Sequence, residues 1–231
     1  MKLTYYGHSC FGVQAGGKHL LFDPFITKND LAQDAGVERD RIPADYILVS
    51  HGHFDHCDDA VAIAQRTGAT VIGGFEVTQW LHEQGVPEEQ VHSMNHGGAH
   101  RFEFGRVKFV SAIHSSTMPD GSPGGTPGGF VIDTTEGGFY YSGDTALTMD
   151  MQLISAAFPQ LRFAVLCVGD NYTMGYEDAL RAADFVKCDH VLGVHYDTWP
   201  IIHLDQQEAQ RAFRIAGKTL HLPAIGETVE L

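Results

Sequence analysis

The pattern of apolar and polar positions predicts short β-strands at the start of the chain. Apolar residues alternate with other residues through positions 3–6, 9–14 and 19–22, and glycines stand at the intervening turns. Positions 46–49 are Tyr-Ile-Leu-Val, a continuous apolar run. Such a run is typical of a strand that is buried on both faces.

Later in the chain, expected helices alternate with expected strands. Residues 58–67 predict a helix, because Ala60, Ile63 and Ala64 share one face and Gly68 follows as a stop signal. Helices are also expected at residues 75–83, 151–157, 176–187 and 205–216. Strands are expected at residues 70–72, 101–104, 107–113, 130–133, 139–141, 163–168, 190–194 and 219–222. Each half of the chain thus has antiparallel strands followed by β/α alternation, which favours an α/β fold in one domain, residues 1–231.

Composition and charge narrow the classes of partner. The 231 residues are 43% hydrophobic and 19% charged, as in ordinary globular proteins. Acidic residues outnumber basic ones 29 to 15, a formal charge of −14, so we expect neither nucleic acid nor a membrane as a partner. The sequence has no apolar stretch of ~18 residues and no visible signal peptide. The four cysteines lack the spacing of a disulfide framework, which favours reduced thiols and a cytoplasmic location.

The 14 histidines are numerous for this chain, and three of them fall in one short segment. His51, His53, Asp55 and His56 follow directly after the expected strand at residues 46–49. Residues two apart in an extended segment point the same way, so His51 and His53 are expected to face one site. Imidazole and carboxylate ligands suit Zn²⁺, Mn²⁺ or Fe²⁺. The alternative, a polar loop whose histidines cap a helix, accounts less well for this pattern.

Other candidate ligands stand just past the ends of expected strands. His114 follows residues 107–113, Asp144 follows the strand at 139–141, and His195 follows residues 190–194. Active sites of layered α/β folds gather at such positions. Asp23 follows an early strand in the same way, and we expect its carboxylate to orient a ligating histidine.

Several stretches along the whole chain resemble the metallo-β-lactamase superfamily. They resemble most the small metal-dependent hydrolases related to ascorbate-6-phosphate lactonase. The matching stretches are residues 7–11 (GHSCF), 21–24 (LFDP), 50–56 (SHGHFDH), 114–116 (HSS), 143–145 (GDT), 169–175 (GDNYTMG) and 195–198 (HYDT).

The resemblance implies an αβ/βα four-layer sandwich, with two mixed β-sheets face to face and helices outside. It also implies two divalent metal ions per chain, Zn first and otherwise Mn, Fe or Ni. His51, His53 and His114 would hold the first ion; Asp55, His56 and His195 would hold the second. Asp144 would bridge both ions, and a water or hydroxide between them would be the nucleophile.

Three residues are candidates for catalytic roles beside the metal ions: Asp55, His8 and Asp170. His8 is interpreted as an oxyanion donor or proton shuttle, or else as a hydrogen-bonded structural histidine. Asp170 is expected to touch a ligand or the substrate, or else to form a turn. Trp199 either walls the pocket or packs between subunits, and the loop 120–129 is either a lid or simply flexible. The histidines at 92, 96 and 100 are expected in a polar surface turn.

The function that these features favour is metal-dependent hydrolysis of a small ester, lactone or phosphate-containing metabolite. The main alternative is a metal-dependent phosphodiesterase or nuclease acting on nucleic acid, but the thin spread of basic residues argues against it. An oxygen- or NO-reducing di-iron protein and a non-catalytic binding module are two further hypotheses. The expected partner is a small-molecule substrate, and the sequence does not decide whether the chain forms a homo-oligomer.

Overall fold

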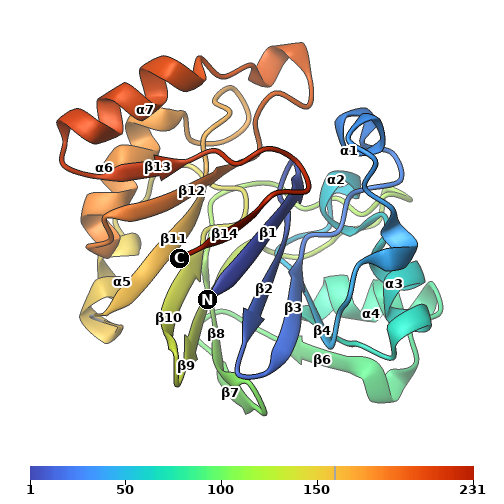
Figure 1. Cartoon of the computed structure of the whole chain (residues 1–231). Helices are drawn as coiled ribbons and strands as arrows, with labels where there is room; N and C mark the ends of the chain where they lie inside the picture. Colours follow the sequence, from blue (N-terminus) through green and yellow to red (C-terminus); the bar gives the residue numbers. More distant parts are fainter. Residues whose placement is uncertain (159) are drawn as a thin grey trace.

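The computed structural model describes residues 1–158 and 160–231, which form two β-sheets packed face to face. Helices lie on the outer faces, with α5 to α7 beside one sheet and α1 to α4 beside the other (Figure 1). This is the four-layer αβ/βα arrangement that the resemblance predicts. The two ends of the chain meet, because the amino group of Met1 donates a hydrogen bond to the carbonyl oxygen of Leu231.

The first sheet has seven strands in the order β14-β1-β2-β3-β4-β5-β6. Strands β1, β2 and β3 pair antiparallel, and β3 to β6 pair parallel. The strands are β1 (Lys2–Gly7), β2 (Cys10–Ala15), β3 (Lys18–Phe22), β4 (Tyr46–Val49), β5 (Thr70–Gly74), β6 (Val91–Met94) and β14 (Thr228–Glu230). Because β1 and β3 are both antiparallel to β2, their carboxyl ends reach the same edge as that of β4.

The second sheet repeats this plan with seven strands in the order β13-β12-β11-β10-β9-β8-β7. Strands β7 to β10 pair antiparallel, and β10 to β13 pair parallel. The strands are β7 (Ala99–Phe102), β8 (Gly105–Ser111), β9 (Gly128–Thr134), β10 (Gly137–Tyr141), β11 (Leu161–Cys167), β12 (His190–Val194) and β13 (Thr219–His221). Strands β8, β10 and β12 therefore run in one direction and end at one edge.

The helices begin and end where local signals place them. Helix α3 ends at Gly68, whose φ of 74° is the left-handed conformation that glycine adopts without strain. Asp205 caps α7 by accepting a hydrogen bond from the backbone of Glu208. The helices are α1 (Asp30–Asp34), α2 (Phe54–Cys57), α3 (Ala60–Thr67), α4 (Phe75–Glu83), α5 (Met151–Ala157), α6 (Tyr176–Val186) and α7 (Gln206–Ile215). Short 3-10 turns lie at Arg39–Arg41, Glu88–Gln90 and Pro200–Ile202.

Four short elements, α1, α2, β6 and β14, were not predicted from sequence, and two histidines lie elsewhere than predicted. His92 lies in β6 and His100 lies in β7, so the expectation that both occupy a polar turn is wrong. Strand β6 forms one edge of its sheet and has only one buried residue, Met94. An edge strand needs little apolar surface, so hydrophobic patterning does not reveal it.

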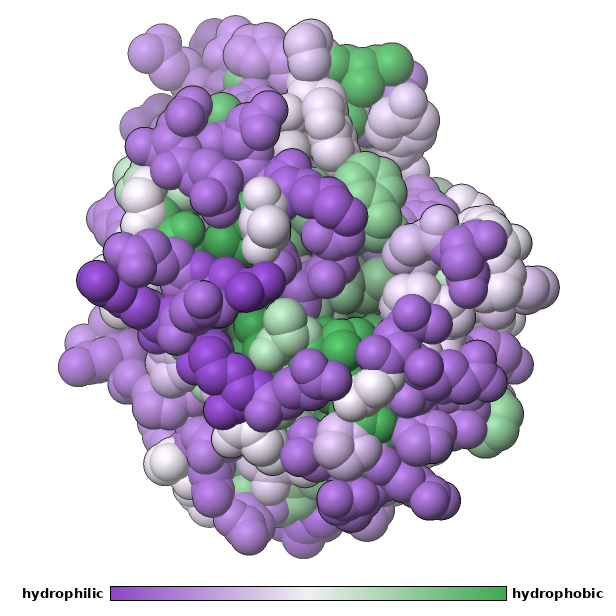
Figure 2. All heavy atoms as spheres, turned by 90° about the vertical axis from the view of Figure 1, so that its right-hand side faces the viewer, coloured by the Kyte–Doolittle hydropathy of each residue, from purple (hydrophilic) through white to green (hydrophobic). Residues whose placement is uncertain are grey.

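Aromatic side chains join the two sheets. Phe11 and Phe22 of the first sheet stack with ring centroids 4.5 Å apart, and Phe22 meets Phe139 and Tyr141 of the second sheet edge-on at 5.8 and 5.6 Å. All four side chains are fully buried. On the face that Figure 2 shows, most of the surface is hydrophilic, and apolar side chains reach it only in separate places. Within the part of the chain that the structure describes, no helix is long and apolar enough to cross a membrane.

Candidate metal centre

The candidate site lies at the edge where the aligned strands of both sheets end. Each of six polar residues follows its strand within three positions, and the two sheets bring all six together. The residues and strands are His8 after β1, Asp23 after β3, His51 after β4, His114 after β8, Asp144 after β10 and His195 after β12. The strand ends of both sheets thus bring these six side chains to one edge, the position at which layered α/β folds bind ligands.

The backbone at this edge is unusually constrained. His8, Asp23 and His195 have φ values of 54°, 40° and 60°, in the left-handed region that costs a non-glycine residue ~1–2 kcal/mol. Such outliers persist only where surrounding contacts impose them, and they cluster at functional sites. Gly169 permits the close packing here, since a Cβ on it would lie 1.9 Å from the carbonyl oxygen of His195.

Three histidines form the first group of candidate ligands. One ring nitrogen of each of His51, His53 and His114 lies within 4.8 Å of the others, and His51 Nε2 is 3.0 Å from His53 Nδ1. Burial lowers the pKa of all three histidines, that of His51 well below its usual range. Neutral imidazoles with free lone pairs are the form in which histidine binds a metal ion.

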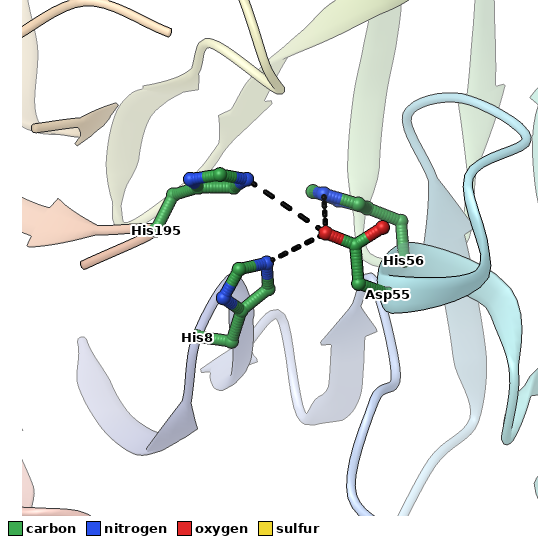
Figure 3. A group of neighbouring side chains, drawn as sticks. All are labelled: His8, Asp55, His56 and His195. Carbon is green, nitrogen blue, oxygen red and sulfur yellow. Dashed lines mark hydrogen bonds and ion pairs between the residues drawn. The ribbon is translucent and has the colours of Figure 1, made fainter. Parts of the chain in front are cut away.

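Asp55 lies at the centre of the second group, surrounded by three imidazoles (Figure 3). Its Oδ2 atom is 3.0 Å from His8 Nε2, 3.6 Å from His56 Nε2 and 3.8 Å from His195 Nε2. Asp55 and His56 belong to α2, whereas His8 and His195 come from the ends of β1 and β12. The group thus combines residues from both halves of the chain.

Asp144 lies between the two groups. Its Oδ2 atom is 2.8 Å from His195 Nε2, 3.3 Å from His56 Nε2 and 3.6 Å from His114 Nε2. Burial is the largest influence on the Asp144 carboxyl and opposes its ionisation, but the neighbouring His195 and His56 hold its pKa well below the usual range. An ionised carboxylate in this position can contact cations in both groups.

The donor set fits divalent metal ions. Within the described residues, the buried polar atoms that have no hydrogen-bond partner include His56 Nε2 and Asp144 Oδ1 of the cluster. Leaving such atoms unpaired costs ~1–3 kcal/mol each, so each calls for an explanation. Nitrogen and carboxylate donors at this density suit Zn²⁺, Mn²⁺ or Fe²⁺, which would satisfy the free lone pairs.

Asp23 is hydrogen-bonded to His56, one of the candidate ligands. Asp23 Oδ2 accepts a 2.6 Å hydrogen bond from His56 Nδ1, another from Ser50 Oγ at 2.6 Å and one from the Tyr141 hydroxyl. Asp23 Oδ1 accepts from the backbone of Ser50 at 2.7 Å. The bond to Nδ1 leaves Nε2 of His56 free for a cation. Ser50 and Tyr141 were not singled out from sequence, although Ser50 directly precedes the histidine motif.

His8 is bound at both ring nitrogens. Burial, together with the nearby His195, lowers the pKa of His8 to about 4, so the ring is neutral at pH 7. An ionised carboxylate only accepts, so the contact with Asp55 places the proton on Nε2, and Nδ1 then accepts from the Thr198 hydroxyl at 2.8 Å. The His8 carbonyl also accepts from the backbone of His195 at 2.9 Å. This geometry favours the hydrogen-bonded structural interpretation over a free proton shuttle.

The expectation that Asp170 belongs to this site is wrong in the structure. Its side chain is exposed, accepts a bond from the backbone of the adjacent Asn171, and lines a different cavity with Tyr176 and Asp205. Strand β11 ends at Cys167, and Asp170 lies three positions past that end in a tight turn. The turn is closed by a hydrogen bond from the Asp170 N–H to the Met174 carbonyl oxygen, and it directs the carboxylate into this other cavity.

A cavity of about 470 Å³ opens beside both ligand groups. Its lining includes His53, Asp55, His114, Asp144 and His195, with Phe54, Ser115, Tyr172, Trp199 and Ile201. Trp199 therefore forms part of the wall. No described residue of the loop 120–129 lines the cavity, and Asp120 of this loop accepts a 2.7 Å bond from Trp80, so the lid interpretation finds no support in this geometry.

Comparison with known proteins agrees with the fold. Residues 2–195 match the family model described as Beta-lactamase superfamily domain. A UPF0173 metal-dependent hydrolase of Christiangramia forsetii is 51% identical over 231 residues, with all of both chains covered. One of Flavobacterium johnsoniae is 46% identical over the same length, again with complete coverage.

Solved structures also have this fold. Igni18, a metallo hydrolase from Ignicoccus hospitalis, is 32% identical with a TM-score of 0.83, and the match covers 99% of this chain and 97% of that one. An isothiocyanate hydrolase from Delia radicum gut bacteria has a TM-score of 0.75 over 100% of this chain and 99% of that one, at 20% identity. That second likeness extends to the fold alone.

Proposed function

The chain belongs to the UPF0173 metal-dependent hydrolase family of the metallo-β-lactamase superfamily, and from this we propose a two-metal hydrolase of small ester, lactone or phosphate-containing metabolites. His51, His53 and His114 would hold one ion, Asp55, His56 and His195 the other, and Asp144 would bridge them. We propose that the bound metal is Zn²⁺, with Mn²⁺, Fe²⁺ or Ni²⁺ as the alternatives. The relation to ascorbate-6-phosphate lactonase stays a prediction, as does a cytoplasmic location, which the four free cysteines support.

The observation that carries this proposal is the position of Asp144 Oδ2, within 3.6 Å of His114 in one group and of His56 and His195 in the other. A carboxylate placed between two sets of imidazoles is suited to hold two cations next to each other. Two such cations, when bound, lower the pKa of a shared water molecule and polarise the carbonyl or phosphoryl group to be attacked.

The protein's own residues then have distinct tasks. Asp23 fixes the ring of His56, and His8 fixes the carboxylate of Asp55, so both ligands keep one orientation. Phe54 and Trp199 line the cavity and limit water around the reacting group. No serine or cysteine nucleophile is required, and Cys57 lies outside the cluster, its thiol 3.7 Å from the Gly52 carbonyl.

The test is metal-dependent turnover of small activated esters, lactones and phosphodiesters by the full chain. Elemental analysis should approach two equivalents of metal, and a strong chelator should abolish activity and lower the melting temperature. His51→Ala should abolish turnover, whereas His100→Ala, a change at an exposed histidine of β7, should not. One metal equivalent or fewer after reconstitution would contradict the two-metal assignment.

The nuclease alternative is tested with the same preparation. The formal net charge of the chain is −14, so it repels every phosphate of a polynucleotide that lies near it. A metabolite with one phosphate is repelled at that one group only. We expect weaker activity on RNA and DNA than on small substrates at ~0.1 M salt. Faster cleavage of polynucleotides that is also lost in His51→Ala would favour the nuclease.

A further inference from the structure

Phe54 and Trp199 form an aromatic wall of the cavity beside the candidate metal ligands, and the buried Phe25 packs behind them. The ring centroids of Phe25, Phe54 and Trp199 lie 5.6 to 6.2 Å apart. His8, which holds Asp55, contacts this wall, with its ring centroid 5.1 Å from that of Trp199 and 5.6 Å from that of Phe25. The three aromatic residues come from separate segments of the chain, and the fold brings them to one side of the ligand cluster.

The apolar surface continues at the mouth of the cavity. Tyr172, Ile201 and Phe54 line the cavity and are 56%, 56% and 45% exposed. Single exposed apolar residues are normal on any protein, but several converging on one cavity indicate a surface that a ligand covers. Aromatic and branched aliphatic side chains bind apolar groups and offer little to a charged group.

The charge of the lining supports the same conclusion. Among the described residues that line the cavity, none is a lysine or an arginine, and the ionisable ones other than Tyr172 are the candidate metal ligands. Lys28, which contacts the loop after α2, is paired with Asp58 and does not line the cavity. Protein sites for phosphate or carboxylate usually supply guanidinium or ammonium donors. An anionic group remote from the reacting bond would lose hydration here without a charged partner.

We propose that the substrate is a neutral ester or lactone whose non-reacting part is an aliphatic or aromatic group without phosphate or carboxylate. This rests on the proposed function and narrows it. The apolar part lies against Phe54 and Trp199 while the carbonyl faces the ligand cluster. Water oxygen bonds to the carbonyl carbon, and the acyl C–O bond breaks with its electron pair on the leaving oxygen. That oxygen takes one proton from the water, and the products are an acid and an alcohol.

The size of the cavity suits this class. A volume of about 470 Å³ lies within the ~300–1,000 Å³ range of small-molecule sites. It accepts an acyl chain of several carbons or one aromatic ring together with the reacting carbonyl. Because each methylene moved from water to an apolar site favours binding, catalytic efficiency should rise with acyl length up to the limit of the wall, by up to about fourfold per methylene.

The experiment measures kcat/KM of the metal-loaded full chain on p-nitrophenyl acetate, butyrate and hexanoate, and on the negatively charged mono-p-nitrophenyl succinate. We expect a rise with acyl length and at least a tenfold lower value for the succinate than for the butyrate. Trp199→Ala should flatten the rise, whereas Phe75→Ala, at an aromatic residue 54% exposed outside this cavity, should leave it unchanged. Ile201→Lys should raise the succinate value relative to the butyrate value.

The outcomes separate this inference from the proposed function. Higher efficiency on the succinate than on the butyrate, or no rise with acyl length, would overturn the inference while leaving a metal-dependent hydrolase. Absence of turnover on esters, lactones and phosphodiesters alike would contradict the proposed function, and quenching of Trp199 fluorescence would then decide the inference. The chain has two tryptophans, so Trp80→Phe leaves the fluorescence of Trp199 alone. In this variant, 4-nitrobenzyl alcohol should quench the Trp199 fluorescence more than 4-nitrobenzyl phosphate does. Equal quenching, stronger quenching by the phosphate, or none at all would overturn the inference.

Discussion

Replacing Asp23 with asparagine should weaken both the folded protein and its hold on metal, although Asp23 is not a predicted ligand. The carboxylate is fully buried and accepts hydrogen bonds from His56 Nδ1, from the Ser50 backbone and hydroxyl, and from Tyr141. Asparagine has nearly the same shape but only one acceptor oxygen, and its amide group donates.

The magnitude follows from these contacts. If the amide oxygen takes the place of Oδ2, the amide nitrogen faces the Ser50 N–H, which then lacks a partner at a cost of ~1–3 kcal/mol. The remaining bonds also lose the negative charge that makes such bonds about twice as strong. We expect the free energy of unfolding of chelator-treated protein to fall by about 4 kcal/mol. Metal affinity should fall ~10–100-fold, because His56 is no longer held in one orientation.

Urea denaturation with chelator measures the first effect, and competition with a chromophoric chelator measures the second. The matched control is Asp40→Asn, the same chemical change at an exposed carboxylate that pairs with Arg39. This control should change stability by no more than ~1 kcal/mol and leave metal affinity unchanged. If Asp23→Asn behaves like Asp40→Asn in both assays, the assignment of Asp23 as the residue that orients His56 is wrong.

Two further predictions concern Asp144 and pH. Asp144→Asn should lower both metal equivalents together in elemental analysis, whereas His195→Ala should empty one of them; retention of both metals in Asp144→Asn would refute the bridging assignment. In metal-free protein, burial holds the pKa of His8 near 4, below the ~6.5 expected in the unfolded chain, so the unfolded state binds more protons between these values. The contribution of His8 to the free energy of unfolding should therefore fall by about 1 kcal/mol from pH 7 to 5.5. The measurement is the urea midpoint of metal-free protein, which should depend less on pH in His8→Asn than in wild type. An equal dependence of the urea midpoint on pH in metal-free wild-type protein and metal-free His8→Asn would contradict this.

Much of the architecture could be predicted from local patterns. The alternation in β1 to β3, the apolar run of β4 and the amphipathic face of α3 each depend on neighbouring residues, so the sequence displays them directly. The edge strands β6 and β14 were missed because they bury few side chains, and helices α1 and α2 are only five and four residues long. Helices this short have no full amphipathic period to recognise.

The candidate ligands could also be named from sequence, because metal chemistry limits the choice of residue types and strand ends limit their positions. His51, His53, Asp55 and His56 are close in the chain, and their proximity in space follows almost automatically. Asp170 also follows a strand but does not reach the cluster, because the turn in which it lies directs its carboxylate into another cavity.

Only the tertiary structure decided which distant groups meet. Asp144 Oδ2 lies within reach of His56, His114 and His195 because two sheets from different halves of the chain end at one edge. The hydrogen bond of His8 to Asp55 and the contact of Phe25 and Phe54 with Trp199 arise in the same way. Sequence patterns show which face of each segment is apolar and must be buried, but contacts between distant segments depend on how the two sheets pack. Residue types therefore determined the metal chemistry, and the packing of the two sheets decided the shape and apolar character of the cavity beside it.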